Sequence, residues 1–275
     1  MLCKHASFFA KLALAMVSCS STVALAQTAP PLGQAGSFAV LGASAVTNTG
    51  PTVVTGDLGI WPSTASSITG FPPGTVIGAT HPGDAVAQQA QTDVTTAYNN
   101  LAGQACSPGN VLTGIDLGGL TLTPGVYCFS TSAQLTGTLT LDAQGNSAAV
   151  FVFQIGSTLT TASASRVLVI NGGSSCNVFW QIGSSATLGT TTAFAGNILA
   201  LASITLNTGV VAPGRALART GAVTLDTNGV GGCSGAGGVL PGSTALTPAL
   251  SQWALLALTL LIATAGFVAM RRHDS

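Results

Sequence analysis

Threonine is the residue whose type and spacing offer the most chemistry in this sequence. A Thr-Leu phrase recurs six times, and its first threonines, from Thr121 to Thr224, are 17, 20, 29, 18 and 19 residues apart. Each threonine presents a hydroxyl that bonds to water beside a methyl group that does not. Rows of such side chains could hold an ordered layer of water. Threonine is also a good strand former, and exposed strands use it for that reason alone.

Short strand-like phrases that return about every 18 to 20 residues predict a β-solenoid, in which each coil adds a strand to each of about three faces. Strands alternate, so the leucines would point inward and the threonines outward. The outward positions would form one array of two columns, namely Thr121, Thr123, Thr138, Thr140, Thr158, Thr160, Thr187, Gly189, Thr205, Asn207, Thr224 and Asp226. A β-sandwich is the alternative, but it does not require the same phrase at a near-constant step.

One helix is expected at residues 84–102. Asp84 can cap its first turn, and Gly103 can end it. Its apolar stripe comprises Val86, Ala90, Val94, Ala97, Tyr98 and Leu101. A second recurring phrase, as in residues 151–155, is apolar on both sides of its strand, and such strands are covered from outside. We therefore expect the helix to lie along that face of the solenoid.

The N-terminus is typical of an exported protein. Lys4 and Lys11 accompany an apolar run that ends in the small-x-small pattern Ala24-Leu25-Ala26. Residues 1–26 are therefore predicted to be a signal peptide. A lipoprotein signal that is cut before a lipidated Cys19 is the alternative.

The C-terminus has the layout of a membrane anchor. Residues 234–247 are rich in Gly, Pro, Ser and Thr, as flexible linkers are. Residues 253–270 are uncharged and would span ~27 Å as a helix, which is enough for a bilayer core. Arg271 and Arg272 would then lie on the cytoplasmic side. A buried C-terminal helix is the alternative.

The tail also resembles the C-terminal sorting signals of Gram-negative bacteria that carry an I-P-T-L-S-E-W motif. Pro248, Leu250, Ser251 and Trp253 match the motif, and the signal would occupy residues 248–275. The resemblance implies transient anchoring in the membrane during export, followed by display at the cell surface or secretion.

The remaining domain, residues 27–233, contains four cysteines: Cys106, Cys128, Cys176 and Cys233. An even number in an exported protein suggests two disulfides. Three connectivities are possible, and we favour Cys106–Cys128 with Cys176–Cys233. The spacings include no C-x-x-C pair, so no zinc or other metal site is expected.

Scarce charge excludes several classes of function. Only 5% of the 275 residues are charged, and the domain has three arginines against six aspartates, without lysine or glutamate. A nucleic-acid binder needs a basic patch, which is missing here. A glycan-cleaving solenoid enzyme needs paired carboxylates or a cationic base. His81 precedes Pro82 where the helix begins, so a cap or loop role is expected for it rather than catalysis. We predict a monomer that is not an enzyme and uses no cofactor.

Several stretches within residues 33–230 resemble, in order, the microbial ice-binding proteins. They are residues 36–50, 54–59, 117–127, 150–156, 177–183, 196–200 and 214–219. The resemblance implies a discontinuous right-handed β-solenoid, roughly triangular in section, that both ends of the chain form together beside a long helix. It also implies adsorption to ice, thermal hysteresis and inhibition of ice recrystallisation. Some members carry a T-A/G-x-T/N motif on the ice face, which makes Thr49, Gly50 and Thr52 secondary candidates.

The threonine array and the resemblance together favour adsorption to ice as the function. A cell-surface adhesin or a structural envelope protein without ice activity is the alternative. An adhesin for glycans would be expected to present aromatic platforms, and the domain has few aromatic residues to offer besides those in core-like phrases.

Overall fold

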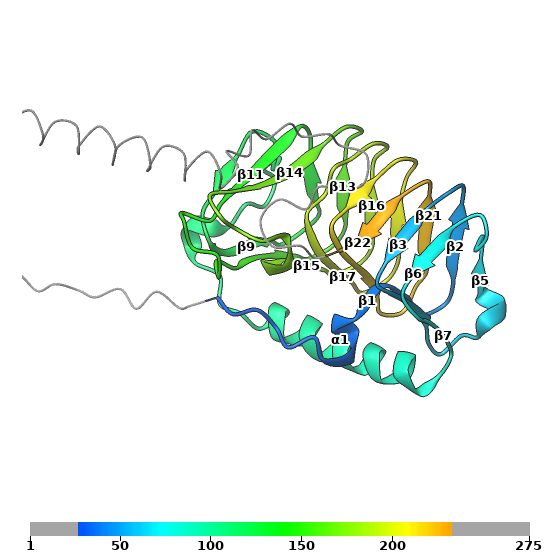
Figure 1. Ribbon diagram of the computed structural model, residues 1–275. Helices are drawn as coiled ribbons and strands as arrows, with labels where there is room; N and C mark the ends of the chain where they lie inside the picture. The colour runs from blue at the N-terminus through cyan, green and yellow to red at the C-terminus, as the bar shows by residue number, and fades with distance from the viewer. Residues whose placement is uncertain (1–26, 233–275) are drawn as a thin grey trace, which may run out of the picture. The chain divides into compact units, whose positions relative to one another are not determined.

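The computed structural model describes residues 27–232, which form a β-solenoid with one long helix along it (Figure 1). The strands pair in parallel and lie on three sides of the coil. The β-solenoid and the helix beside it confirm the fold expected from the repeat. The predicted signal peptide, linker and C-terminal anchor lie outside the described residues. Among residues 27–232, no helix is long and apolar enough to cross a membrane.

The first side is an eight-stranded sheet that faces the helix. Its strands, in spatial order, are β7 (Thr80–Pro82), β4 (Asp57–Ile60), β1 (Phe38–Gly42), β20 (Gly214–Ala218), β17 (Gly196–Ala200), β15 (Val178–Ile182), β12 (Phe151–Ile155) and β9 (Gly125–Phe129). These strands include the phrase that is apolar on both faces. One face packs into the coil and the other against the helix.

The second side is a seven-stranded sheet, and the helix does not cover its outer face. Its strands, in spatial order, are β10 (Ala133–Leu135), β13 (Leu159–Thr161), β16 (Ala186–Leu188), β18 (Ile204–Leu206), β21 (Val223–Asp226), β2 (Val46–Thr49) and β5 (Ile68–Thr69). Burial alternates along these short strands, because every second side chain points into the coil.

The third side consists of two short sheets. One contains β14 (Arg166–Ile170), β11 (Thr138–Asp142) and β8 (Thr121–Leu122), and the other contains β19 (Val211–Ala212), β22 (Gly229–Gly231), β3 (Val53–Thr55) and β6 (Thr75–Ile77). Ala193 forms isolated bridges to Arg166 and Val211 and so connects the two sheets.

The coils are not stacked in the order of the chain. Strands β1, β2 and β3, which form the first coil, pair with β20, β21 and β22, which form the last. The chain therefore builds one end of the solenoid, returns along its length through the helix, and then builds coils back toward its own beginning. We call the junction between these first and last coils the seam.

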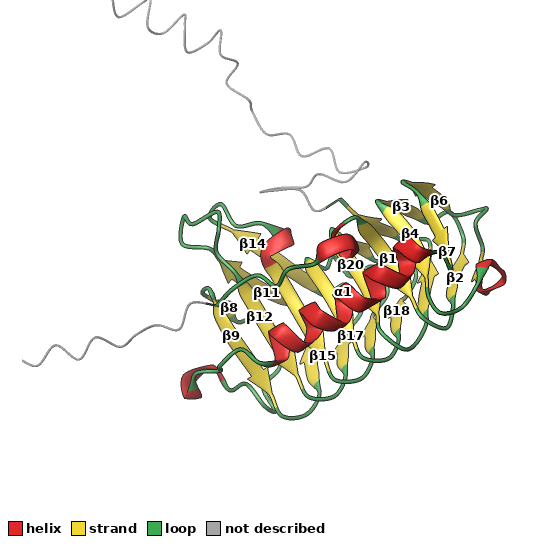
Figure 2. Cartoon of the chain, turned by 90° about the horizontal axis from the view of Figure 1, so that it is seen from below, coloured by secondary structure: helices red, strands yellow, loops and turns green. Residues whose placement is uncertain are grey.

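Helix α1 (Ala85–Ala102) runs across the eight-stranded sheet (Figure 2). Asp84 accepts a hydrogen bond from the N–H of Ala87 at 2.9 Å, which confirms the predicted N-cap, and Gly103 is the C-cap. The apolar stripe is buried as expected, except that Ala87 takes the place of Val86. Val86 is exposed, so that part of the prediction was wrong. The sheet-facing stripe begins one residue later than the spacing suggested.

Aromatic residues fill the coil interior beneath β12 and β15. The ring of Trp180 stacks on Phe153, with 4.0 Å between ring centroids and an interplanar angle of 9°. Its indole N–H donates to the carbonyl of Ala195 at 3.0 Å, so the buried polar group is satisfied. The predicted inward leucines at 139, 159, 188, 206 and 225 are all buried, whereas Leu122 is only half-buried.

Within residues 27–232, four short 3-10 helices occur at the turns: η1 (Gly33–Gly36), η2 (Ala65–Ser67), η3 (Pro108–Asn110) and η4 (Ser175–Asn177). The predicted disulfide between Cys106 and Cys128 is present and joins the segment after α1 to β9. Cys176 lies half-buried in η4. Its predicted partner Cys233 lies outside the described residues, so that pairing stays a prediction.

Candidate functional site

The outer face of the seven-stranded sheet carries a row of threonines, one on each of six of its strands. Thr160 of β13 is in register with Thr187, which is in register with Thr205, and the row continues across the remaining strands. We call this row the threonine column, and its members are Thr160, Thr187, Thr205, Thr224, Thr47 and Thr69. Adjacent strands are ~4.8 Å apart, so six rows extend over ~24 Å.

Small polar or methyl-bearing residues flank the column on its N-terminal side. Thr158 donates a hydrogen bond to the hydroxyl of Ser132 at 2.8 Å. Ser185 accepts from the N–H of Ser203 at 3.2 Å, and Ser203 accepts from the N–H of Ala222 at 3.2 Å. These hydroxyls are held by the neighbouring coil, so the flank is ordered along the sheet.

Asn207, Asp226 and Thr49 flank the column on its C-terminal side. Asp226 is in register with Thr49 and is the only charged residue in the seven strands. Its carboxylate accepts hydrogen bonds from the hydroxyls of Thr208 and Thr227. The one charge in this sheet is thus engaged with neighbouring hydroxyls.

The expectation that all the Thr-Leu phrases share one array was wrong for the first two. Thr121, Thr138 and Thr140 lie in β8 and β11 on the third side of the solenoid, and Thr123 lies between β8 and β9. Each of these two phrases follows a turn at a glycine with positive φ, Gly119 (80°) before the first and Gly137 (86°) before the second. Strand β10 ends before the turn at Gly137, and the second phrase begins after it. The same phrase is therefore used on two different sides.

The predicted register was also wrong by two residues at one strand. Thr160, and not Thr158, is aligned with Thr187. The pairing places the inward side chains of Leu159 and Ala186 side by side in the core. Leu159 would point inward in either register, so the alternation of faces does not distinguish them, and the observed pairing of β13 with β16 decides that Thr160 enters the column.

The secondary motif divides between surface and core. Thr49 is exposed beside Asp226, and Gly50 turns the chain with a φ of 76°. Thr52 is fully buried, and its hydroxyl accepts the N–H of Asn228 at 3.0 Å. Thr52 therefore cannot contribute to an outer face, which corrects the expectation from the motif letters.

Sequence reasoning missed two members of the column, Thr47 and Thr69. They follow Val46 and Ile68 instead of preceding a leucine in the repeated phrase. A broader pattern of one inward β-branched residue followed by threonine could have identified them. Their coils lie at the N-terminal end of the chain, outside the region where the repeat is evident.

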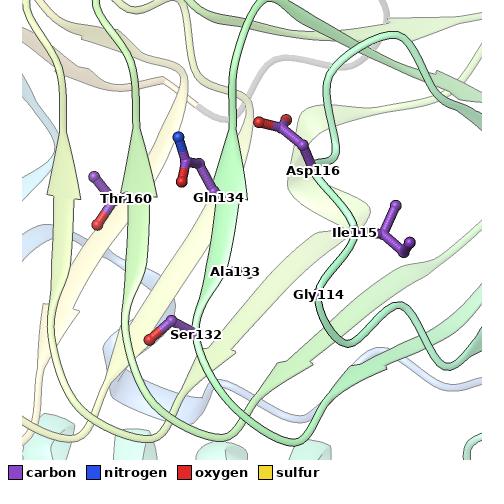
Figure 3. A pocket seen from close by; sticks show the side chains of 7 residues that line it. All are labelled: Gly114, Ile115, Asp116, Ser132, Ala133, Gln134 and Thr160. Atoms are coloured by element: carbon purple, nitrogen blue, oxygen red, sulfur yellow. The ribbon is translucent and has the colours of Figure 1, made fainter.

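A shallow pocket of about 260 Å³ lies where this face ends (Figure 3). It is lined by Gly114, Ile115, Asp116, Ser132, Ala133, Gln134 and Thr160. Desolvation raises the pKa of the Asp116 carboxyl, but hydrogen bonds from the N–H groups of Gly118 and Thr136 outweigh it and leave the pKa below its ordinary value. Asp116 is therefore ionised at neutral pH.

Another group of titratable residues lies where α1 begins. The Nδ1 of His81 is 2.8 Å from Asp84, and its Nε2 is 3.9 Å from Asp57. The N–H of Ala87 is the main cause that lowers the pKa of Asp84. Among residues 27–232, no three His, Cys, Asp or Glu side chains are placed to hold a metal ion. Asp84 caps α1, and His81 of β7 lies beside Asp57 of the neighbouring strand β4, so structural contacts account for this group of side chains.

Comparison with known proteins gives two matches to family models. Residues 40–231 match the model described as Ice-binding-like, and residues 248–272 match the IPTL-CTERM motif. The first match lies entirely within the described residues, and the second covers the tail that resembles a sorting signal.

Individual relatives carry the same description. The chain is 62% identical over 218 residues to the "Ice-binding protein" of Nostoc sp. (strain HG1), covering 78% of this chain and 79% of that protein. It is 37% identical over 237 residues to "Ice-binding protein 1" of Shewanella frigidimarina (strain NCIMB 400), covering 74% of this chain but only 26% of that protein.

Solved structures agree with the fold. An ice-binding protein from an Antarctic biological consortium has a TM-score of 0.72 at 50% identity, covering 75% of this chain and 92% of the other. One from the Antarctic ascomycete Antarctomyces psychrotrophicus has a TM-score of 0.70 at 41% identity, covering 74% and 98%.

Proposed function

Since the chain belongs to the Ice-binding-like family, we propose that it adsorbs to ice crystals through the outer face of its seven-stranded sheet. Adsorption would inhibit recrystallisation and produce thermal hysteresis. The threonine column is the observation that carries this assignment, because it repeats one side chain at one spacing across six strands.

The side-chain chemistry of the column suits an ordered layer of water. Threonine is branched at Cβ, so few χ1 rotamers are available to it and its hydroxyl and methyl groups take restricted positions. The hydroxyls can anchor water molecules at the interval between strands, and the methyl groups can lie in the spaces between those molecules. Every strand of the column except the edge strand β5 is paired on both sides, which keeps the rows rigid before any ice is met.

Low charge on the face supports the same assignment. An ionised side chain orders water around itself and would disturb a crystalline layer. Asp226 is the only charge in the seven strands, and two hydroxyl groups already occupy its carboxylate. Arg215 and Arg219 belong to or follow β20 on the side that faces the helix.

Two tyrosine substitutions test the choice of face. Thr205→Tyr places a bulky ring in the middle of the threonine column, and we expect a several-fold loss of recrystallisation inhibition by the folded protein. Thr138→Tyr is the matched control, because Thr138 is an exposed threonine in the third side of the same solenoid. Equal loss in both variants, or loss only in Thr138→Tyr, would mean that the face is wrongly assigned.

We propose further that the protein acts without catalysis or a cofactor, and as a monomer. Five of the six aspartates of the domain accept hydrogen bonds from backbone N–H groups, namely Asp57, Asp84, Asp93, Asp116 and Asp142. The pocket beside Asp116 contains no second carboxylate that could act with it.

The match to the IPTL-CTERM motif supports export and a place at the cell surface. Transient anchoring through residues 253–270 in a Gram-negative envelope is the finer form of this proposal. An ice-binding domain displayed in this way could hold the cell to ice, which would also satisfy the adhesin alternative. Pulse-labelling of the cells would test it, because a processed tail shortens the chain after its arrival in the membrane fraction.

A further inference from the structure

One strand of the seven-stranded sheet, β10, has no threonine in line with the threonine column. Gln134 of β10 is in register with Thr160 and thus occupies the seventh row, at the edge of the sheet. Its side chain is exposed, and its amide donates to the hydroxyl of Thr136 at 3.3 Å. The side chain therefore leans along its own strand and offers no methyl and hydroxyl pair at the spacing of the column.

The surface also stops being flat at this row. The pocket of about 260 Å³ lies between Thr160 and the segment 114–116, with Ser132, Ala133 and Gln134 in its wall (Figure 3). Asp116 forms an isolated bridge with Gln134, so the segment 114–116 lies beside β10 as the outermost row. Ile115 is exposed on that row. A planar crystal surface in contact with Thr160 would meet a hollow at the next row.

A charge appears one row further out, beside Gln134. Asp116 is fixed beside Gln134 by the N–H groups of Gly118, at 2.7 Å, and Thr136, at 2.9 Å. It adds a charge to a region where β13, β16 and β18 have none. Side-chain type and flatness thus change between the row of Thr160 and the row of Gln134, and a charge follows on the next row.

We propose that the ice-contacting surface of this protein ends between Thr160 and Gln134, so that only six of the seven strands touch the crystal. This inference rests on the proposed function and adds the extent of the bound area. Gln134 and the segment 114–116 determine that extent, because they remove the repeat on one edge while the column continues to Thr69 at the other.

The boundary can be mapped with Thr160→Tyr and Gln134→Tyr in the purified chain. Both positions are exposed and adjacent in register, so both variants should melt at the temperature of the unmodified chain. We expect recrystallisation inhibition to fall several-fold in Thr160→Tyr and to stay unchanged in Gln134→Tyr. Gln134→Lys, which adds a charge instead of bulk, should also leave inhibition unchanged and serves if the tyrosine variant misfolds.

A loss in Gln134→Tyr or Gln134→Lys that equals the loss in Thr160→Tyr would overturn the proposed boundary. The boundary would also be overturned if Thr160→Tyr kept full inhibition while Thr205→Tyr lost it, because the bound area would then end further inside the sheet. Failure of the proposed function looks different, since the unmodified folded chain would itself show no inhibition.

Discussion

The hydroxyl of Thr47 donates a hydrogen bond to the hydroxyl of Thr224 at 3.4 Å, although 177 positions separate the two residues. Thr47 belongs to the first coil and Thr224 to the last, and they meet in the threonine column at the seam. A continuous face of six threonines therefore depends on how firmly the two ends of the chain are held together.

Gln91 of α1 is placed to hold the seam closed. Its buried amide donates to the carbonyl of Gly42 in β1 and to the carbonyl of Ala218 in β20, both at 3.0 Å. We expect Gln91→Leu to lower the free energy of unfolding by about 1–3 kcal/mol, because two hydrogen bonds to buried backbone are lost. Chemical denaturation would measure the change.

Gln88→Leu is the matched control for this prediction, since Gln88 is exposed on the same helix. It should change stability by less than about 0.5 kcal/mol. An equal effect of the two substitutions would show that hydrophobic exposure on α1, and not the seam, is responsible.

The aromatic stack should be the most sensitive point of the core. Trp180 is fully buried, between Phe153 at 4.0 Å and Phe194 at 4.8 Å between ring centroids. Trp180→Ala is expected to destabilise the protein by about 3–5 kcal/mol through lost burial and the cavity left behind. Trp180→Phe should lower the melting temperature by less than Trp180→Ala does. Equal melting temperatures for the two variants would contradict the role of the Trp180 ring in the core.

Loss of the disulfide between Cys106 and Cys128 should lower the stability of the fold without abolishing ice binding by the seven-stranded sheet. The bond closes a loop with a sequence separation of 22, for which about 2–4 kcal/mol is typical. We expect the melting temperature to fall in Cys106→Ser/Cys128→Ser, while recrystallisation inhibition near 0 °C persists. Because the bond lies near β9, away from the column, a loss of inhibition in a still-folded variant would be unexpected.

Acid should destabilise the fold below about pH 4, where the carboxyls of the unfolded chain become protonated. The N–H of Ala87 lowers the pKa of Asp84, and hydrogen bonds lower that of Asp116 against desolvation. A carboxyl with a lowered pKa in the folded state contributes stability above its unfolded pKa. That contribution is lost as the pH falls through the folded pKa.

Asp84→Asn separates the cap from its charge, because asparagine caps helices about as well as aspartate. We expect the variant to remain stable at neutral pH and to lose less stability than the unmodified chain between about pH 5 and pH 2. Melting curves over that range would measure the difference, and parallel curves for the two proteins would contradict the assignment.

The sequence by itself determined the solenoid, the helix and the general nature of the face. The inward leucines, the Asp84 cap and the apolar stripe are local signals, since each depends on residues a few positions apart. They predicted the strands, the helix close to its observed bounds, and an outer surface that is rich in threonine and poor in charge.

Only the tertiary structure decided which threonines form that surface. The turn at Gly137 moves Thr138 and Thr140 to another side, and the pairing of Leu159 with Ala186 selects Thr160 over Thr158. Thr47 enters the column because the first coil pairs with the last. Turn geometry, register in the core and the closing of the seam are relationships between distant segments, so the spacing of a repeated phrase could not reveal them.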